Sequence, residues 1–350
     1  MATLLVFGAL VSCCVKLSRR RRRVKSRPPC PSENGKIACS TMARTVDFEE
    51  RGYEKRVNLV IDHVSGHLAE DLSLEGLARV AAFSPFHFHR IFRAITGETL
   101  FAFVQRLRLE RAAGALTYHR DRSILAVALD HGFSSAATFA RAFKAHFGMS
   151  ATDWRRGGAE RWSKRGKANR NQSKAKLRPP RHGGSRMTKE ATMNVRIGEL
   201  PRYHVAYMRY VGPYGPHGIP ALWKRLHEWM RTRGLDQSDA ITLGIGHDDP
   251  EVTAVEKCRY DACVVVQPDF AGDKWVNVMD VPGGRNAISV FSGTAHEIED
   301  AWSTLYRTWL PSSGYEPDDR PCLEVYRGHP DVAGRPGAFR CELCIPVRPR

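Results

Sequence analysis

The sequence has few of the features that mark secreted and membrane proteins. None of its nine cysteines lies between residues 44 and 156, and an odd number of cysteines cannot pair completely. A small secreted domain would instead carry closely spaced, paired cysteines. The apolar run over residues 4–17 is too short to cross a bilayer. These absences exclude a disulfide scaffold and favour a cytoplasmic protein that has no membrane partner.

Motifs for metal binding and for covalent catalysis are also missing. Cys341 and Cys344 form a C-x-x-C pair, but no second pair of Cys or His residues occurs at zinc spacing. The chain has no order of Ser, His and Asp that indicates a hydrolase. We therefore predict no metal, no cofactor and no enzymatic activity. Heptad repeats are absent as well, so the sequence does not signal a coiled-coil dimer.

Positive charge is concentrated in two segments. The whole sequence has 54 Lys and Arg against 37 Asp and Glu, a net charge of +17. Residues 1–43 carry 9 basic residues and 1 acidic residue, and residues 157–190 carry 11 and 2. Residues 44–156 carry 16 and 13, whereas residues 191–350 carry 18 and 21. This distribution predicts that a polyanion is bound by the N-terminal half of the chain.

A chain of 350 residues favours two or three domains. We expect residues 1–43 to be a disordered basic leader, or to precede a true start at Met42. Residues 44–156 have apolar residues at helical spacing throughout. Residues 157–190, rich in Gly, Ser, Lys, Arg and Asn, are typical of a flexible basic linker. Residues 191–350 alternate six short β-like runs with two helical stretches, which predicts an α+β domain.

The N-terminal half contains an internal repeat. The segment SPFHFHRIF at residues 84–92 matches SAATFARAF at residues 135–143, and Gly97 and Gly148 follow the two copies. The first Ser of each copy is placed to cap a helix, and Pro85 suits the first helical position. The helix before each copy repeats with an offset one residue smaller, so the second turn is predicted to be one residue longer.

Each repeated helix has two stripes. Phe88, Ile91, Phe92 and Ile95 form a buried stripe in the first copy, and Phe139, Ala142, Phe143 and His146 occupy the same positions in the second. The opposite stripes are Phe86, His89, Arg90 and Arg93 in the first copy and Ala137, Ala140, Arg141 and Lys144 in the second. One charged stripe is often only a solvated face. Here two charged stripes occur in register, and each lies on a helix that follows a short helix and a tight turn. This arrangement favours helices that enter the major groove of DNA.

These residues resemble the DNA-binding domain of AraC/XylS-type bacterial transcription regulators. The resemblance covers residues 55–156 and includes Arg106-Leu107-Arg108-Leu109-Glu110-Arg111-Ala112 and the motif from Gly132 to Gly148. It implies an all-α domain in which two helix-turn-helix units, joined by a rigid helix, read successive major grooves of double-stranded DNA. It also implies that the first recognition helix presents Phe86, His89 and Arg90, and that the second presents Ala136, Ala137, Thr138, Ala140 and Arg141.

This sequence departs from the family at one point and is short of polar groups at another. The family usually has a proline after the last glycine, where this chain has Ser150 to Arg155. The second helix offers mainly methyl groups, which can touch thymine but cannot form bidentate hydrogen bonds. We therefore expect Arg90 and Arg141 to make most of the base or phosphate contacts.

The C-terminal half contains a second duplication. Gly212 precedes a helical stretch that contains Trp223, and Gly293 precedes one that contains Trp302. Each half therefore reads as strand, Gly turn, helix and strand. With the motifs CRYDAC (258–263), PGGR (282–285) and LEVY (323–326), residues 191–350 resemble the GyrI-like small-molecule-binding domain.

Glu324 is the centre of the predicted effector site. Alternation along a strand puts Cys322, Glu324 and Tyr326 on one face and Leu323 and Val325 on the other. The duplication sets Gly244 in the other half against Glu324, so one half supplies an acid and the other a gap. The resemblance implies a groove lined with aromatics that favours cationic or polar organic effectors. The candidate effector-binding residues are Glu324, Tyr326, Tyr214, Trp223 and Trp302.

The sequence also allows other interpretations of the C-terminal half. Trp223 and Trp302 could be core residues, and Glu324 could be an edge-strand residue in water. Glu324 with Tyr214 or Tyr326 could also act as base and acid in a hydrolase of small electrophiles.

At the level of the whole chain, we predict a sequence-specific transcription regulator that a small molecule controls. Because the linker is long, transmission between rigid domains is doubtful, and an effector could instead alter contacts with RNA polymerase. A non-specific basic DNA binder is the alternative that the charged segments alone suggest.

Overall fold

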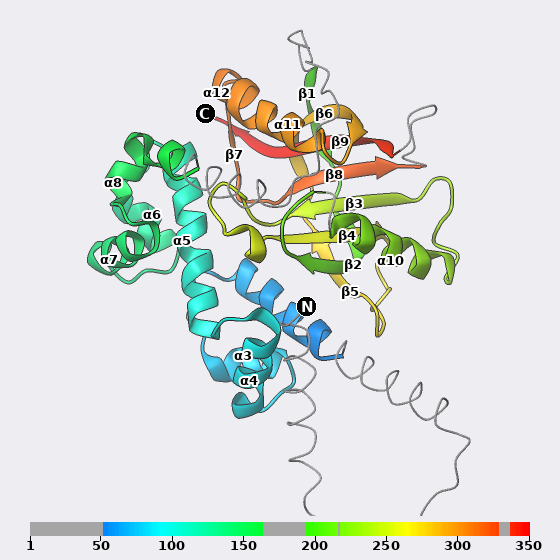
Figure 1. Ribbon diagram of the computed structural model, residues 1–350, viewed down its shortest axis with the longest axis horizontal. Helices are drawn as coiled ribbons and strands as arrows, with labels where there is room; N and C mark the ends of the chain where they lie inside the picture. Colours follow the sequence, from blue (N-terminus) through cyan, green and yellow to red (C-terminus); the bar gives the residue numbers. More distant parts are fainter. Residues whose placement is uncertain (1–51, 164–193, 216–217, 329–336) are drawn as a thin grey trace, which may run out of the picture. The chain divides into compact units, whose positions relative to one another are not determined.

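The computed structural model describes residues 52–163, 194–215, 218–328 and 337–350 (Figure 1). The predicted leader over residues 1–43 lies outside the described residues, as does the predicted linker from residue 164 onward. Residues 159–163 are helical, so the described helices continue past residue 156. No helix in the described ranges is both long enough and apolar enough to cross a membrane.

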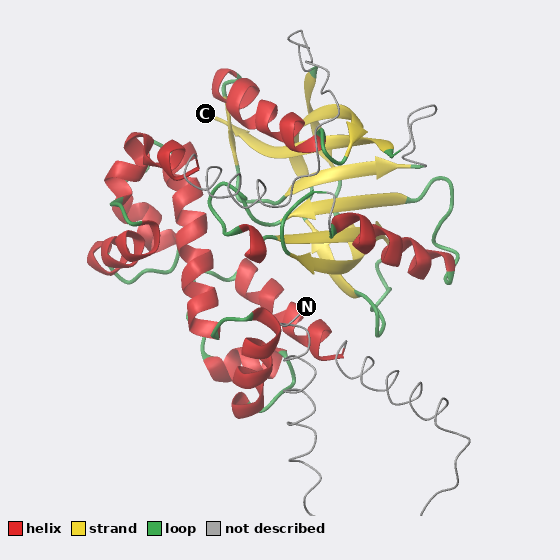
Figure 2. Cartoon of the chain, in the orientation of Figure 1, coloured by secondary structure: helices red, strands yellow, loops and turns green. Residues whose placement is uncertain are grey.

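The described chain divides into two compact units. The first contains residues 52–60 and 73–103, and the second contains residues 61–72 and everything from residue 104 onward. A helix over residues 52–66 therefore begins in the first unit and ends in the second. Figure 2 shows that helices dominate the earlier part of the chain and strands the later part.

The first unit contains a helix-turn-helix made of α3 (Leu74–Val80) and α4 (Pro85–Thr96). The Ser84 hydroxyl accepts a hydrogen bond from the backbone N–H of His87, and Pro85 is the first residue of the helix. Gly97 ends α4 in the left-handed conformation, with a φ of 72°. Phe88 and Phe92 are fully buried. The predicted cap, start and apolar stripe of this helix are therefore confirmed.

The second unit repeats this motif with α6 (Ile124–Asp130) and α7 (Ala136–Phe147), which follow α5 (Leu100–Tyr118). The Ser135 hydroxyl accepts from the backbone N–H of Thr138, and Gly148 ends the helix with a φ of 69°. Phe139 and Phe143 are buried in the core between these helices. The turn spans residues 131–135 here and residues 81–84 in the first copy, which confirms the predicted extra residue.

A serine takes the place of the family's proline after the second copy. The Ser150 hydroxyl accepts from the backbone N–H of Asp153 at 3.1 Å and donates to its carboxylate at 2.6 Å, which caps α8 (Ala151–Asp153). The next element, η1 (Trp154–Gly158), begins with a buried indole whose N–H donates to the carbonyl of Ala113 at 3.0 Å. The aromatic residue thus anchors this end of the domain to α5.

The C-terminal domain is built on an antiparallel sheet. Its strands are β1 (Val195–Leu200), β2 (Tyr203–Val211), β3 (Ile241–Gly246), β4 (Arg259–Val265), β5 (Asn277–Val281), β6 (Gly284–Thr294), β7 (Tyr315–Pro317), β8 (Cys322–Arg327) and β9 (Ala338–Pro349). The order in the sheet is β1-β6-β9-β8-β3-β4-β2-β5, and β7 pairs with β9. The helices are α10 (Ile219–Arg231), η2 (Val255–Lys257), α11 (Ile298–Thr304), η3 (Leu305–Trp309) and α12 (Leu310–Ser312).

This order confirms the predicted duplication. β2, α10, β3 and β4 form one half, and β6, α11, β8 and β9 form the other. The two halves meet where β3 pairs with β8, at the centre of the sheet. The chain therefore has the predicted fold class, a helical helix-turn-helix domain followed by a duplicated α+β domain.

The two faces of the sheet have separate cores. Leu323 and Val325 pack into one core, whereas Tyr326 packs into another together with α11 and α12 residues. The predicted alternation along β8 is therefore confirmed. Cys341 lies in the core of the helix-covered face and Cys344 in the opposite one. Because their side chains lie on different faces, the C-x-x-C pair cannot present both thiols to one metal ion.

Candidate DNA-binding helices and effector pocket

The outer face of α4 is exposed along its whole length. Phe86 is 69% exposed, and His89, Arg90 and Arg93 are exposed as well. The guanidinium of Arg90 lies 5.6 Å from the centre of the Phe86 ring. No carboxylate in the described part of the chain forms an ion pair with either arginine. This face therefore offers two uncompensated cations next to an aromatic ring.

The outer face of α7 has fewer polar groups. Ala136, Ala137, Ala140, Arg141 and Lys144 are exposed, as predicted for a face that meets DNA. Thr138 is half-buried, and its hydroxyl donates to the carbonyl of Ser135 at 2.8 Å. That hydroxyl is therefore committed to the start of the helix, and the methyl group is what Thr138 can offer to a base.

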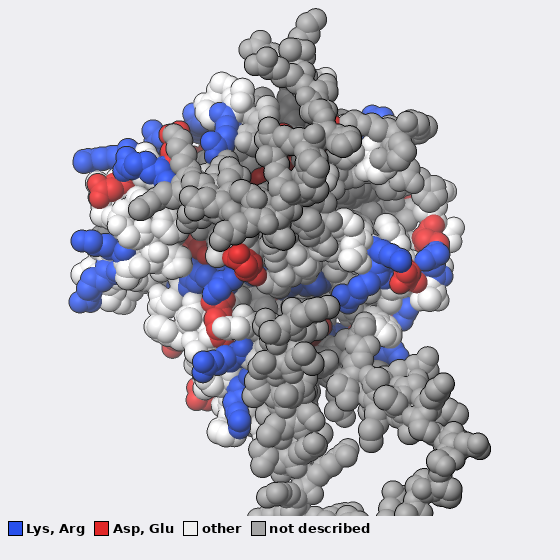
Figure 3. Space-filling model, in the orientation of Figure 1, with Lys and Arg blue, Asp and Glu red and all other residues white. Residues whose placement is uncertain are grey.

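Charge on the described surface is mixed in sign. In the view of Figure 3, Lys and Arg side chains are interspersed with Asp and Glu. This agrees with the nearly balanced counts in residues 44–156 and 191–350. Any preference of the described domains for DNA must therefore come from local faces such as those of α4 and α7.

Glu324 lies on β8 directly opposite Gly244 on β3. Its Oε2 accepts hydrogen bonds from the hydroxyls of Tyr260, at 2.6 Å, and Tyr326, at 2.9 Å. Its Oε1 accepts from the indole N–H of Trp302 at 3.3 Å. Three neutral donors therefore converge on one carboxylate at the junction of the two halves.

Gly244 makes room for this arrangement. A Cβ atom at this position would overlap the hydroxyl of Tyr260 and the carboxylate of Glu324. The predicted pairing of Glu324 with a glycine is therefore present in the sheet. Because Gly244 has no side chain, the carboxylate of Glu324 has room at this position.

The two tryptophans related by the duplication belong to the same hydrogen-bond network around Glu324. Trp302 donates to Glu324 directly, and Trp223 donates to the hydroxyl of Tyr260 at 3.3 Å. The Trp223 ring also lies 5.1 Å from that of Tyr326. Both tryptophans are half-buried and line the same cavity as Glu324. They are therefore pocket residues that also pack against the sheet.

Burial raises the pKa of Glu324, and the hydrogen bonds from its three donors act against that rise. Among the described residues, none of the groups that shift this pKa is a cation. The neighbouring Tyr260 and Tyr326 have pKa values raised well above the ordinary range by burial and by the carboxylate, so their hydroxyls stay protonated. The pocket is thus a desolvated carboxylate among aromatic rings, which is suited to a cation.

The chain matches two families over consecutive segments. Residues 77–157 match the helix-turn-helix domain, and residues 193–348 match the GyrI-like small molecule binding domain. The SPbeta prophage-derived protein YosT of Bacillus subtilis is 34% identical over 156 residues, which cover 45% of this chain and all of YosT. The chain belongs to the AraC-type regulators with a GyrI-like domain.

Two relatives share both domains of this AraC-type regulator. The right origin-binding protein of Escherichia coli is 28% identical over 305 residues, covering 81% of this chain and 95% of the relative. The transcriptional regulator Rob of Salmonella typhimurium is 25% identical over 296 residues, with the same two coverages. The protein is accordingly a DNA-binding transcription regulator with a small-molecule-binding domain.

Within the GyrI-like domain, the structure gives Tyr214 and Tyr260 roles that the sequence did not separate. The Tyr214 hydroxyl donates to the carbonyl of Arg259 at 2.5 Å and accepts from the backbone N–H of Asp248. Tyr214 lines the cavity but holds β4 rather than the carboxylate. Tyr260, which sequence reasoning missed, donates to Glu324 together with Tyr326 and Trp302. Its place between two charged residues in CRYDAC was the available signal.

Proposed function

We propose that the regulator reads DNA with the outer faces of α4 and α7. The support is the repetition of one arrangement, a serine cap, a buried Phe pair and an exposed arginine, in both copies. Arg90 and Arg141 provide the charged contacts, and the alanines of α7 provide apolar contacts to thymine methyl groups. His89, Arg93 and Lys144 extend the two faces toward the phosphates. Contact with RNA polymerase stays a prediction.

The GyrI-like domain is proposed to bind a lipophilic organic cation against Glu324. The observation that carries this proposal is a half-buried carboxylate whose close partners are three neutral donors. A ligand that brings its own positive charge would supply the missing counter-charge, and the rings of Trp223, Trp302 and Tyr326 would cover its apolar surface. The named two-domain relatives are a transcriptional regulator and an origin-binding protein, so we propose binding rather than turnover at this site.

Thermal melting of the full chain tests the pocket. Tetraphenylphosphonium serves as the cation, and triphenylphosphine oxide serves as a neutral compound of similar shape. We expect the cation alone to raise the melting temperature of the wild type, since a ligand that binds only the native state stabilises it. Glu324→Gln should lose most of that rise. Glu228→Gln, an exposed acid on α10 outside the cavity, should keep it. An equal rise in wild type and Glu324→Gln would show that the cation binds elsewhere.

A further inference from the structure

Strand β4 contributes to two different networks through neighbouring residues. Tyr260 faces the pocket and donates to Glu324. Arg259 and Asp261, on either side of it, point to the opposite face because side chains alternate along a strand. Both are buried and both form ion pairs there. One strand therefore carries the pocket on one side and a charged cluster on the other.

Asp261 is connected to the helix over residues 52–66 through Arg209. It forms a bidentate ion pair with Arg209, its cross-strand partner on β2, at 2.6 and 2.7 Å. The side chains of Asp261 and Arg209 are 0% and 1% exposed. The guanidinium of Arg209 also lies 2.8 Å from the carboxylate of Asp62, which accepts a hydrogen bond from Tyr207 as well. Asp62 belongs to the helical segment within the second unit.

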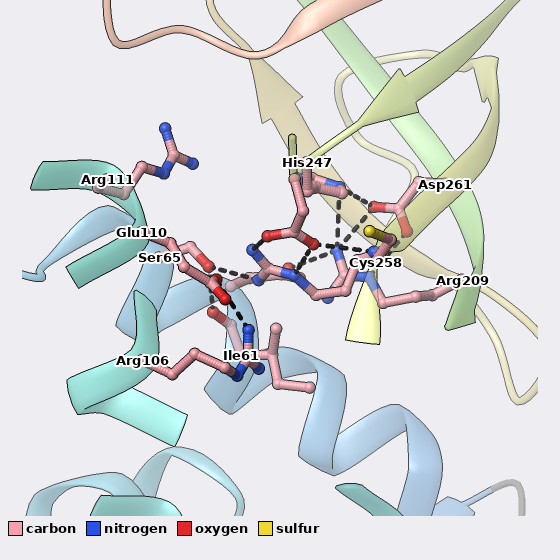
Figure 4. Close-up of polar contacts among 12 residues, drawn as sticks. Ile61, Ser65, Arg106, Glu110, Arg111, Arg209, His247, Cys258 and Asp261 are labelled. Carbon is pink, nitrogen blue, oxygen red and sulfur yellow. Dashed lines mark hydrogen bonds and ion pairs between the residues drawn. The ribbon is translucent and has the colours of Figure 1, made fainter. Parts of the chain in front are cut away.

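Arg259 makes a second connection to the same segment. Its guanidinium is held by Asp248 at 2.7 and 2.8 Å and donates to the Ser65 hydroxyl at 3.0 Å. The Ser65 hydroxyl in turn donates to the carbonyl of Ile61 at 2.8 Å. Figure 4 shows Ser65 and Arg209 within one continuous set of polar contacts. Because Asp62 and Ser65 are three residues apart, they lie on the same side of their helix.

The segment that receives these contacts is also fixed to α5. Arg108 of α5 donates to the carbonyl of Leu68 at 2.8 Å and to that of Glu70 at 2.8 Å. Residues 61–70 therefore contact β2 and β4 through Asp62 and Ser65, and contact α5 through the carbonyls of Leu68 and Glu70. This route does not pass through the predicted linker.

We infer that strand β4 couples occupancy of the Glu324 pocket to the position of residues 61–70 and α5, and through them to DNA affinity. This inference rests on the proposed function of the pocket. A bound cation competes with the Tyr260 hydroxyl for the Glu324 carboxylate, so it shifts β4 at the residue between the two ion pairs. Buried bidentate pairs tolerate few geometries, which makes them suited to passing on such a shift.

The coupling is measured as a ratio of affinities in the full chain. The DNA is a duplex selected from a random pool by the wild-type protein, and the ligand is tetraphenylphosphonium. The Kd of the protein for the duplex is determined with and without saturating ligand. The Kd of the protein for the ligand is determined with and without the duplex. We expect both ratios to agree and to reach about fivefold or more in the wild type, because linkage is reciprocal.

The matched test removes the helix side of the contacts and leaves the pairs of the GyrI-like domain intact. Asp62→Asn with Ser65→Ala should bring the ratio close to one, while each Kd measured alone changes by less than about threefold. The control, Asp239→Asn with Ser238→Ala in an exposed loop, should keep the wild-type ratio. A wild-type ratio in the Asp62 and Ser65 variant overturns the inference, as does ligand binding to the wild type without any change in DNA affinity.

A second measurement separates this inference from the proposed ligand. Tyr260→Phe removes the hydroxyl that joins β4 to Glu324, and hydrogen exchange then reports on residues 61–70 without any ligand. Coupling predicts altered protection there relative to the wild type. Unchanged protection overturns the route through β4 even if the cation binds. Altered protection together with no cation binding would support the route and reject the proposed ligand class.

Discussion

Gly244 and Glu324 face each other across the central strand pair of the GyrI-like domain, where β3 meets β8. Each belongs to a different half of the duplication, so a symmetric pair of side chains would have filled this position from both sides. The glycine leaves the space that the carboxylate and the Tyr260 hydroxyl share. The asymmetry of an otherwise repeated fold is thus what creates its pocket.

Gly244→Ala is therefore expected to damage the pocket more than the sheet. The added methyl group overlaps the carboxylate of Glu324 and the hydroxyl of Tyr260, so both must move. Overpacking of this kind costs about 1–3 kcal/mol of unfolding free energy. We expect affinity for tetraphenylphosphonium to fall at least about tenfold, a change of about 1.4 kcal/mol.

Gly246→Ala is the matched control, because it lies on the same strand and a Cβ there meets Tyr214 only at ordinary contact distance, 3.7 Å. Urea unfolding and ligand titration on both variants check the prediction. Equal losses of affinity in the two variants would mean that the strand, not the shared space, is sensitive to substitution.

Arg90→Ala and Arg141→Ala are each expected to weaken DNA binding by about 1–3 kcal/mol if the arginine contacts a base. If it contacts a phosphate, the loss should be uniform over sequences and the salt slope should fall by about one. Arg231→Ala, an exposed arginine of α10, is the control and should bind as the wild type does. Titrations of a selected duplex and of a scrambled one at several salt concentrations distinguish these outcomes. If both variants matched the wild type, α4 and α7 would not be the reading helices.

The recognition helices and the position of Glu324 could be predicted because they produce periodic patterns in the sequence. The Ser caps, the Phe stripes and the glycines repeat at fixed offsets, and alternation on β8 sorts Glu324 from its neighbours. β5 and β7 have five and three residues, too few for such a pattern. Their positions follow from pairing with β2 and β9.

The polar contacts on the opposite face of β4, such as the Arg209–Asp62 ion pair, produce no such pattern in the sequence. Arg209 and Asp62 are 147 positions apart in the numbering, and neither lies in a repeated motif. Their pairing depends on how the helix over residues 52–66 packs against β2, which no local pattern encodes. Tyr260 was missed for a related reason, since its role requires the β3–β4 and β3–β8 registers together.

The turns of the two helix-turn-helix units differ at one backbone position. Substitutions at this position should change the free energy of unfolding in opposite directions in the two turns. Ala82 has a φ of 50° and Gly132, its counterpart in the longer turn, has a φ of 77°. The left-handed conformation costs a non-glycine residue about 1–2 kcal/mol, whereas glycine adds about 0.5–1 kcal/mol of entropy cost. Ala82→Gly should therefore raise the free energy of unfolding by about 0.5 kcal/mol.

Gly132→Ala should instead destabilise the protein by about 2–4 kcal/mol, because strain adds to overlap. The new methyl group would overlap the carbonyl of Leu68 and the guanidinium of Arg108. Gly114→Ala, in the middle of α5 with open space around its Cβ, is the control and should be neutral or stabilising. Denaturant unfolding of the three variants checks the order. A neutral Gly132→Ala would show that this turn relaxes freely.

Glu110 should make the stability of the protein fall as the pH rises from about 4 to about 7. It is a buried residue of α5, and burial raises its pKa to about 7, against the opposing effect of Arg106, which lies 3.0 Å away. In the unfolded chain a Glu titrates near its ordinary value of about 4.3, so between these two values the folded protein binds more protons. The stabilisation is complete below about pH 4 and is lost as the pH passes through 7.

The measurement is the difference between wild type and Glu110→Gln, because that subtraction removes the contributions of all titrating groups that the two proteins share. The free energy of unfolding of the wild type should fall by about 1–3 kcal/mol relative to the variant between pH 5 and pH 8. Glu75→Gln, an exposed acid on α3, should show no such difference from the wild type. Parallel curves for wild type and Glu110→Gln would mean that the pairing with Arg106 keeps the carboxylate ionised throughout. In that case the pKa of Glu110 lies below the range and α5 carries a buried charge pair at every physiological pH.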